Sequence, residues 1–220
     1  MDKETIRMVK AYMESQMDES DGAHGKEHVY RVLHHAREIA RTQPEADRDV
    51  LTLACLLHDI GRREQAENPQ LCHAQVGAEK AAAFLREKGF PAGQIQRVCD
   101  CIRTHRYRKE TPPATIEAKI LFDADKLDVC GAMGMARTLL YNGRWGEPVY
   151  TRLENGHISD GRGDSAPSFF QEYTYKLEKM YDRFFTRRGR ELAEERRQIA
   201  ADFYIHLLRE AREADGMPSD

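Results

Sequence analysis

An apolar segment that ends on two polar side chains is the feature that most constrains how this chain can fold. The segment LACLL, residues 53–57, is followed directly by His58 and Asp59. Burying a carboxylate costs much free energy unless the carboxylate is paired or binds a metal ion. The fold must therefore bury the segment and still provide partners for the two polar side chains.

Helical periodicity dominates the rest of the chain, and the strict alternation typical of β-strands is absent. Apolar residues in 26–41, for example, recur every three or four positions, a spacing that buries one face of a helix. The pattern predicts an all-α fold, a helical bundle. The expected helices cover residues 3–18, 26–41, 47–58, 73–88, 94–106, 168–187 and 189–213, and a further long helix begins near residue 115.

The length of the chain predicts a single domain over residues 1–220, because a chain of this size can bury a core without disulfides. We expect the core at about 20–140. The loop at 142–168 is rich in glycine and has few periodic apolar positions, and loops of this length are usually functional. The C-terminal helices, 168–213, are expected to pack on the core.

Composition and charge argue against several classes of function. The formal net charge is −3, so the chain lacks the basic footprint of a nucleic-acid-binding protein. No apolar run approaches the ~18 residues that span a bilayer, and the charged N-terminal segment has no signal-peptide core. Five cysteines without a CxxC pair indicate reduced thiols. We therefore predict a cytoplasmic protein that binds neither nucleic acid nor membrane.

Polar side chains on apolar helix faces mark a candidate metal site. His28 borders the apolar stripe of its helix, and His58 continues the stripe of the next. Asp125 lies four residues after Leu121 and shares its face, whereas Asp123 points away from that face. Imidazoles and carboxylates are suitable ligands for a first-row divalent metal. Two histidines and two aspartates from three helices would leave room for water or substrate, as catalytic metal sites do.

Five segments of the chain together carry a resemblance to a known family. They are HGKEHVYRV, LLHDIGRR, HAQVGA, IRTHRYR and ILFDADKLDVCGAMGMAR. In order, spacing and flanking residues they resemble the HD superfamily of metal-dependent phosphohydrolases, in particular a bacterial branch of stand-alone HD hydrolases. The resemblance covers about residues 20–140. It implies an all-α HD-domain helical bundle with a C-terminal helical extension, and a central metal ion held by His28, His58, Asp59 and Asp125.

The resemblance also implies an activity. Some members of this branch hydrolyse nucleoside triphosphates to monophosphates and pyrophosphate, so the expected substrate is a small phosphorylated molecule, with a nucleotide favoured. Arg62 and Arg63 stand where the guanosine-tetraphosphate hydrolases carry an acidic pair, and the GYP motif of the cyclic-dinucleotide branch is absent. These departures argue against those two activities.

The expected mechanism is hydrolysis by metal-activated water. A divalent ion lowers the pKa of its bound water and polarises a phosphoryl oxygen, while cationic side chains stabilise the charge of the transition state. Histidine ligands favour Mn, Fe, Co, Ni or Zn, and Mg is also compatible. The expected catalytic residues are Asp59, Arg62, Arg63 and Asp128, of which Asp128 either orients a ligand or pairs with a cation. Further candidates for substrate contacts are Lys26, Arg31, Arg106 and Lys126.

His73 and His105 leave two interpretations open. With them the pattern resembles the six-ligand set of dinuclear HD proteins, in which Asp59 would bridge two ions. That group includes phosphodiesterases and diiron oxygenases. Alternatively, the two histidines bind substrate phosphate or water beside a single ion, and the sequence favours this interpretation. A non-catalytic ligand-binding module is the remaining class, and the intact set of four ligands argues against it.

The loop at 142–168 has two candidate roles. It either covers the substrate pocket, with Tyr150 or Arg152 reaching a base or phosphate, or embraces a second subunit. The aromatic helix at 168–187 would likewise close the core or form a dimer face, so a homodimer is among the expected assemblies. The segment GRGDS at 161–165 is interpreted as a glycine-rich turn.

Overall fold

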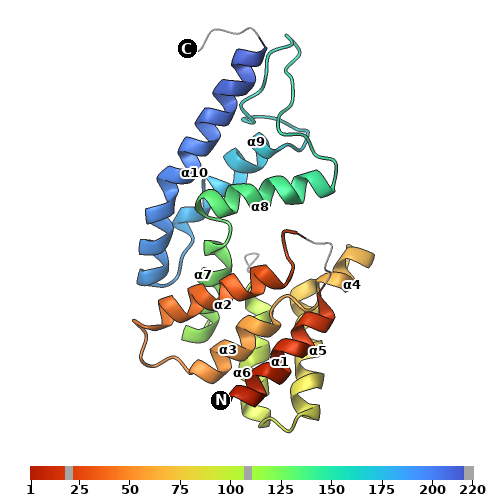
Figure 1. Ribbon diagram of the computed structural model, residues 1–220, viewed down its shortest axis with the longest axis vertical. Coiled ribbons are helices and arrows are strands. Elements are labelled where there is room, and N and C mark those ends of the chain that lie inside the picture. The colour runs from red at the N-terminus through yellow and green to blue at the C-terminus, as the bar shows by residue number, and fades with distance from the viewer. Residues whose placement is uncertain (18–21, 107–110, 216–220) are drawn as a thin grey trace. The chain divides into compact units, whose positions relative to one another are not determined.

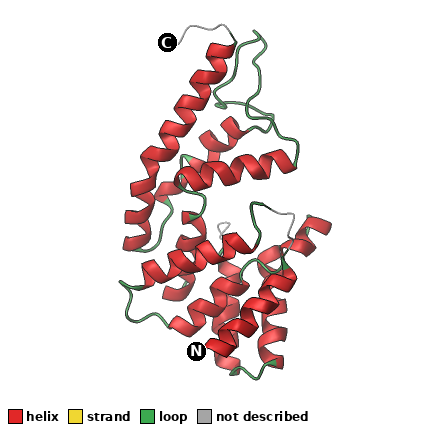
Figure 2. Cartoon of the chain, viewed as in Figure 1, coloured by secondary structure: helices red, strands yellow, loops and turns green. Residues whose placement is uncertain are grey.

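The computed structural model describes residues 1–17, 22–106 and 111–215 (Figure 1). Over these residues the chain consists of helices joined by loops and turns, as Figure 2 shows, and its extended pairing is limited to one isolated antiparallel bridge between Arg152 and Ile158. The all-α prediction is confirmed. None of the described helices combines the length and the apolar character that crossing a membrane requires.

The chain forms two compact units, Met1–Asp125 and Lys126–Asp220. The helices of the first unit are α1 (Lys3–Gln16), α2 (Lys26–Ala40), α3 (Arg48–Leu57), α4 (Arg62–Glu67), α5 (His73–Glu87), α6 (Ala92–Thr104) and most of α7 (Ile116–Leu127). Within it α3 is the central helix, since it packs against α1, α2, α5 and α6 (Figure 1). Seven of the ten residues of α3 are buried, as expected of a helix that is apolar on nearly all sides.

An ion network fixes the start of α3. The Asp47 carboxylate caps the helix by accepting hydrogen bonds from the backbone N–H groups of Asp49 (3.0 Å) and Val50 (3.1 Å). Glu117 on α7 accepts a hydrogen bond from the backbone N–H of Asp47 at 2.8 Å. Arg97 on α6 then pairs with both carboxylates at 2.9 Å. These contacts tie α3 to α6 and α7, and so orient the polar residues that follow α3.

The prediction of one long helix from about residue 115 is wrong, because the structure has two helices there. α7 ends at Leu127, and α8 (Gly131–Arg144) begins after Cys130, whose backbone is extended with φ −103° and ψ 148°. Gly131 has φ +67°, a left-handed value that favours glycine. The chain therefore turns at a point where the apolar periodicity of the sequence continues.

The second unit has an aromatic core. Its elements are α8, α9 (Phe169–Glu172), the π-helix η1 (Tyr173–Leu177), the 3₁₀-helix η2 (Met180–Asp182) and α10 (Arg187–Ala214). The single helix expected at 168–187 is thus three short segments. Tyr173 stacks on Tyr204 with ring centroids 4.1 Å apart, and Phe170 meets the same ring edge-on at 5.4 Å. These rings hold the short segments against α10.

The loop at 142–168 is folded onto this core. The Ser159 hydroxyl donates to the Asp164 carboxylate at 2.6 Å and accepts from the backbone N–H of Gly161 at 3.0 Å. Gly161 has φ +86°, and a Cβ there would lie 2.2 Å from the backbone of Phe170. The aspartate of GRGDS is therefore bonded inside the loop, in keeping with a turn.

Tyr150 and Arg152, the two loop side chains expected to reach a substrate, have partners within the second unit. Tyr150 lies against Phe170 with ring centroids 6.0 Å apart. Arg152 donates two hydrogen bonds, of 2.8 and 2.9 Å, to the Asp215 carboxylate. Their contact with a substrate stays a prediction.

Candidate metal centre

Six titratable side chains meet in the first unit. They are His28 on α2, His58 and Asp59 after α3, His73 at the start of α5, His105 after α6, and Asp125 on α7. Five of the six are at most 1% exposed, and Asp125 is 9% exposed. Charged groups buried this deeply need a partner or a metal ion, so the distances between them indicate what the site can bind.

Asp59 lies at the centre of the cluster. Its Oδ2 is 3.5 Å from His28 Nε2 and 3.6 Å from His58 Nε2. Its Oδ1 is 3.4 Å from His73 Nε2 and 3.5 Å from His105 Nε2. Each oxygen of this carboxylate therefore faces one pair of imidazoles.

Within each pair the two Nε2 atoms are close together. They are 3.3 Å apart in His28 and His58, and 3.2 Å apart in His73 and His105. Asp125 extends the first pair, because its Oδ1 lies 3.3 Å from His28 Nε2. The ligand atoms of the first pair and Asp125 all lie within 4.8 Å of one another, a spacing that a single ion can bridge at ligand distances of about 2 Å.

The outer nitrogens of the rings show which nitrogen can bind a cation. His58 Nδ1 lies 2.8 Å from the carbonyl oxygen of Cys55, and His105 Nδ1 lies 2.6 Å from that of Ile102. Because a carbonyl only accepts, each Nδ1 carries a proton, and in a neutral ring Nε2 then keeps its lone pair toward the cluster. Lone pairs that face one another repel unless a cation or a shared proton lies between them.

Asp59 lacks the hydrogen bonds that a buried carboxylate needs. Neither oxygen accepts one from any residue that the structure describes, although the side chain is fully buried. Arg62 Nε is 2.9 Å from Asp59 Oδ2, a close ion pair without the alignment of a hydrogen bond. Imidazole lone pairs and carboxylate oxygens are the donors that first-row divalent metals bind. The residues present therefore fit a divalent metal ion.

Electrostatics favours the protonation states that metal binding requires. Burial lowers the pKa of His58 to about 4 and the pKa of His73 to about 2, against the smaller opposite effect of the Asp59 carboxylate. Burial by itself would raise the pKa of Asp59, but Arg62 and the neighbouring histidines hold that pKa well below its usual value. At neutral pH the two imidazoles are uncharged and the carboxylate is ionised.

We expect the metal-free protein to lose stability as the pH falls from about 6.5 to about 4. The pKa of His58 is about 6.5 in the unfolded chain and about 4 in the folded chain, so the unfolded state binds more protons between these values. This stabilisation is complete above the upper value and disappears as the pH approaches the lower one, a change on the order of 3 kcal/mol. Urea unfolding of chelator-treated protein at several pH values across this window measures it.

The exposed His34 supplies the control for this measurement. His34→Asn should keep the pH dependence, whereas His58→Asn should make it shallower and leave the part that His73 contributes through its own lowered pKa. The lowered pKa of Asp59 acts outside the window, because its stabilisation is lost only below the ordinary value of 3.8. An unchanged slope in His58→Asn would contradict a neutral, buried imidazole at this position.

Of the two arginines in the motif, the structure brings Arg62 to the cluster. Arg62 is the first residue of α4, and its guanidinium is the one that pairs with Asp59. Arg63 is exposed and donates to the backbone carbonyl of Met17 at 3.0 Å. Adjacent residues on a helix point about 100° apart. Arg62 therefore faces Asp59, while Arg63 faces Met17 at the C-terminal end of α1.

The other cations expected to contact substrate lie at different depths. Lys26 is exposed, and Arg31 and Arg106 are partly exposed. Arg106 is close enough to His73 to contribute to the lowering of its pKa. Lys126 is half-buried and belongs to the second unit. Contact of these side chains with a substrate stays a prediction.

Asp128 also belongs to the second unit, where it pairs with a cation. Arg137 Nη1 lies 2.9 Å from Asp128 Oδ2 and donates to the Asp128 backbone carbonyl at 3.1 Å. Asp128 is fully buried, and Arg137 is 5% exposed. Of the two roles that the sequence left open, this pairing is the one seen in the structure, and a role in orienting a ligand stays a prediction.

Two glycines and a glutamine near the cluster were missed by sequence reasoning. A Cβ on Gly61 would lie 2.4 Å from the carbonyl oxygen of His73 and 2.7 Å from the backbone nitrogen of Gly77. A Cβ on Gly77 would lie 3.2 Å from the carbonyl oxygen of His58. The sequence did offer a signal for the two glycines, because Gly61 lies in the LLHDIG segment and Gly77 in the HAQVGA segment. Gln65, which accepts a hydrogen bond from His73 Nδ1 at 2.7 Å, carried no signal.

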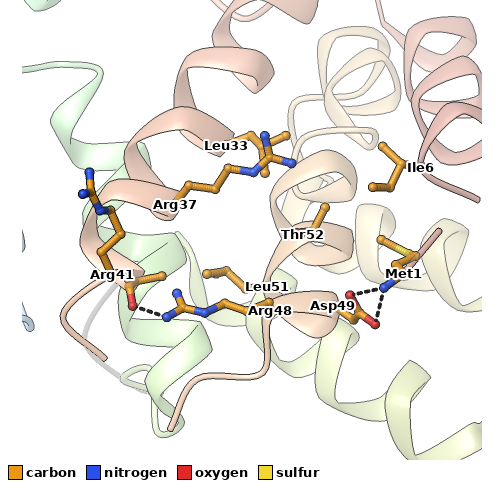
Figure 3. Close-up of a pocket in the computed structure, with 10 residues that line it drawn as sticks. Met1, Ile6, Leu33, Arg37, Arg41, Arg48, Asp49, Leu51 and Thr52 are labelled. Carbon is orange, nitrogen blue, oxygen red and sulfur yellow. Dashed lines mark hydrogen bonds and ion pairs between the residues drawn. The ribbon is translucent and has the colours of Figure 1, made fainter. Parts of the chain in front are cut away.

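A pocket of about 350 Å³ lies elsewhere in the first unit, beside α1, α2 and α3 (Figure 3). None of the clustered histidines or aspartates lines it. Arg48 donates to the backbone carbonyls of Ala40 and Gln43, and Asp49 pairs with the amino group of Met1 at 2.8 Å. Polar side chains of this pocket therefore bind backbone and terminal groups of the chain itself, and the pocket is separate from the metal centre.

Two sequence relatives and a family match bear on this site. A family model of the HD domain matches residues 25–130, which include all six clustered side chains. Protein YpgQ of Bacillus subtilis (strain 168) is 27% identical over 203 residues, which cover 90% of each chain. The 3′-5′ exoribonuclease YhaM of Bacillus pumilus is 27% identical over 143 residues, which cover 58% of this chain and 45% of YhaM. The chain thus spans less than half the length of YhaM.

Solved structures share the fold. The crystal structure of Bacillus subtilis YpgQ in complex with ADP has a TM-score of 0.73 and 24% identity, covering 93% of this chain and 97% of that one. A predicted HD superfamily hydrolase from an uncultured Thermotogales bacterium has a TM-score of 0.64 and 28% identity, covering 93% and 91%. With its buried cluster of histidines and aspartates inside the matched region, the chain carries an HD domain over residues 25–130.

Proposed function

We propose that this protein is a metal-dependent phosphohydrolase that cleaves a phosphate ester or anhydride, with a nucleotide as substrate. The observation that carries the proposal is the environment of Asp59. This ionised, fully buried carboxylate faces four imidazole Nε2 atoms at 3.4 to 3.6 Å and has a guanidinium beside it. Such a set of donors supports a bound divalent ion, and the cation next to it supports an anionic substrate.

The proposal gives separate roles to the side chains of the cluster. His28, His58, Asp59 and Asp125 would hold the ion. When bound, a divalent ion supplies an activated water and polarises a phosphoryl oxygen. Arg62, which is 29% exposed at its side chain and pairs with Asp59, would reach the phosphoryl oxygens of a substrate and stabilise their charge.

Relatives support a nucleotide as the substrate. YpgQ, 27% identical over 90% of its length, has been solved with ADP. YhaM, which matches over 45% of its own length, is a 3′-5′ exoribonuclease. We propose in particular the hydrolysis of a nucleoside triphosphate to the monophosphate and pyrophosphate.

A second candidate is a dinuclear enzyme, either a phosphodiesterase or a diiron oxygenase. The observation in its favour is the pair of His73 and His105, whose Nε2 atoms lie 3.2 Å apart beside Asp59 Oδ1. A neutral imidazole with its proton on Nδ1 has no proton on Nε2 to donate to a phosphate oxygen. The geometry therefore favours a cation over a phosphate between these two rings, and Asp59 would bridge two ions.

Metal content and product analysis together test the proposal. We expect the purified chain to hold a first-row divalent metal, and to release pyrophosphate from a nucleoside triphosphate only when that metal is present. Elemental analysis gives the ions per chain, and a screen of nucleoside triphosphates, diphosphates and a chromogenic phosphodiester gives the bond cleaved. Chelation should abolish product release, and added Mn²⁺ should restore it. Two ions with phosphodiester cleavage would favour the dinuclear phosphodiesterase, and two irons without phosphate release would exclude a phosphohydrolase.

Arg62 and Arg63 form a matched pair of variants for the same assay. Arg62→Gln should lower kcat by about 10²-fold or more, because one preorganised positive group near the developing charge is removed. Arg63→Gln should change kcat by no more than about twofold, since Arg63 points to the Met17 carbonyl. Equal effects of the two substitutions would contradict the assignment of Arg62 to the site.

A further inference from the structure

The imidazoles of the cluster obtain their outer hydrogen bonds in two different ways. His58 and His105 each follow the C-terminal end of a helix, α3 and α6, and each Nδ1 bonds to the carbonyl three residues earlier. The last carbonyls of a helix have no partner within it. A histidine at a helix C-terminus thus finds an acceptor in its own backbone.

His73 cannot use this source, because it is the first residue of α5. The first turn of a helix presents N–H groups, which are donors, and not free carbonyls. The acceptor comes instead from a side chain on another helix, since Gln65 Oε1 on α4 lies 2.7 Å from His73 Nδ1. Among the outer bonds of His58, His73 and His105, this is the one that a substitution can remove.

The orientation of the Gln65 amide is itself fixed. Its Nε2 donates to the backbone carbonyl of Leu71 at 2.9 Å, so the amide oxygen is the atom that faces His73. An amide oxygen only accepts, and His73 Nδ1 must therefore carry the proton. The lone pair of His73 is then on Nε2, which lies 3.4 Å from Asp59 Oδ1 and 3.2 Å from His105 Nε2.

The helix that carries Gln65 is held firmly against α5. Glu64, the preceding residue, pairs with Lys80 on α5. The backbone N–H of Gln65 bonds to the carbonyl of Gly61 at 3.3 Å, and Gly61 itself lies against the backbone of His73. The distance between the amide and the imidazole is thus set by several independent contacts.

We propose that Gln65 is a positioning residue that holds His73 as the Nδ1–H tautomer and thereby sets the affinity of the His73, His105 and Asp59 group for a divalent cation. The proposal rests on the dinuclear form of the proposed metal centre, in which His73, His105 and Asp59 hold a second cation, and deepens it. Residues that bond to the outer nitrogen of a metal-ligating histidine fix its tautomer, and their removal typically weakens metal binding about 10- to 100-fold. Gln65 acts through His73 and touches neither substrate nor cation.

The tautomer is measurable in metal-free protein by long-range ¹H–¹⁵N NMR of ¹⁵N-histidine-labelled chain. Wild type should show His73 with a protonated Nδ1 and an unprotonated Nε2. Gln65→Leu, which keeps the size but removes the acceptor, should shift these signals toward a mixture of tautomers. Gln65→Glu loses the bond to the Leu71 carbonyl but keeps an acceptor oxygen for His73 Nδ1, and should retain the wild-type pattern. Gln75→Leu is the matched control, because Gln75 is exposed on α5 and bonds to Glu79.

Titration with Mn²⁺ gives the second readout, independent of any activity. Gln65→Leu should weaken the binding of one ion about 10- to 100-fold, whereas Gln65→Glu should bind at least as tightly as wild type and Gln75→Leu should be unchanged. Wild-type NMR signals and Mn²⁺ affinity in Gln65→Leu would overturn the proposal, and so would a Gln65→Glu variant that behaves like Gln65→Leu. Failure of the proposed hydrolysis would show differently, as wild-type protein that binds Mn²⁺ but releases neither pyrophosphate nor phosphate.

Discussion

Asp59→Asn is expected to abolish both metal retention and pyrophosphate release. The substitution keeps the shape of the side chain but removes the charge that four imidazole Nε2 atoms and Arg62 face. An amide also presents N–H donors, which would occupy the lone pairs of one histidine pair. The loss of kcat/KM should be at least ~10³-fold, equivalent to about 4 kcal/mol of transition-state stabilisation.

Elemental analysis and the product assay measure this effect on the same preparation. Asp100→Asn is the control, since Asp100 is exposed on α6 and pairs with Arg103 at 3.0 Å. That variant should keep the metal content and the rate of wild type. An Asp59→Asn protein that retains its metal and loses less than about tenfold in rate would show that this carboxylate is not a ligand.

Arg137→Ala should lower the free energy of unfolding by about 3 to 5 kcal/mol, because it leaves the buried Asp128 carboxylate without its cation. Asp128 is fully buried, and the two side chains meet at 2.9 Å. Arg137 also bonds to the Asp128 backbone, so the truncation frees a carbonyl at the turn between α7 and α8. The expected effect is on stability, with the metal content unchanged.

Urea unfolding provides the measurement. Arg187→Ala is the control, because Arg187 pairs with Glu191 at 2.8 Å on the exposed surface of α10, and exposed pairs contribute at most about 1 kcal/mol. Replacing both partners, as Asp128→Leu with Arg137→Met, should recover much of the loss, since no buried charge is then left alone. A cost below about 1 kcal/mol for Arg137→Ala would contradict a buried ion pair.

Helical periodicity was sufficient to predict the fold class and to gather most of the clustered side chains. Burial of an apolar stripe fixes which way its flanking residues point, so His28, His58 and Asp125 could be expected to meet before any coordinates existed. The family motif was equally readable, because its residues lie in short contiguous segments. These predictions depended on local pattern alone.

Contacts between distant segments could not be predicted in the same way. Nothing local distinguishes Arg62 from Arg63, since the direction of each depends on where α4 begins. The pairing of His73 with His105 at Asp59 Oδ1 requires α5 and α6 to approach the end of α3. The sequence interpretation left open both a substrate phosphate and a second metal ion for these two histidines and favoured the phosphate, and their role stays a prediction.

The break between α7 and α8 was missed for another reason. Val129 and Cys130 continue the apolar pattern, so periodicity gives no sign of an end, and only the positive φ of Gly131 marks it. Asp123 illustrates the same limit, because it points away from the face of Leu121 and is nevertheless fully buried. When most faces of a helix are buried, the apolar periodicity does not show which of its polar residues are exposed and which are buried.

The contact between Gly61 and Gly77 has a mechanical consequence for the centre. Side chains in a core can change rotamer to absorb a small displacement. Here the backbones of Gly61 and Gly77 are in direct contact, with no side chain between them that could adjust. A shift of α5 would be transmitted almost unchanged to the peptide between Ile60 and Gly61 and to the carbonyl of His58. The spacing of the ligands is thus built into main-chain geometry, and repacking the neighbouring apolar side chains would leave it nearly unaltered.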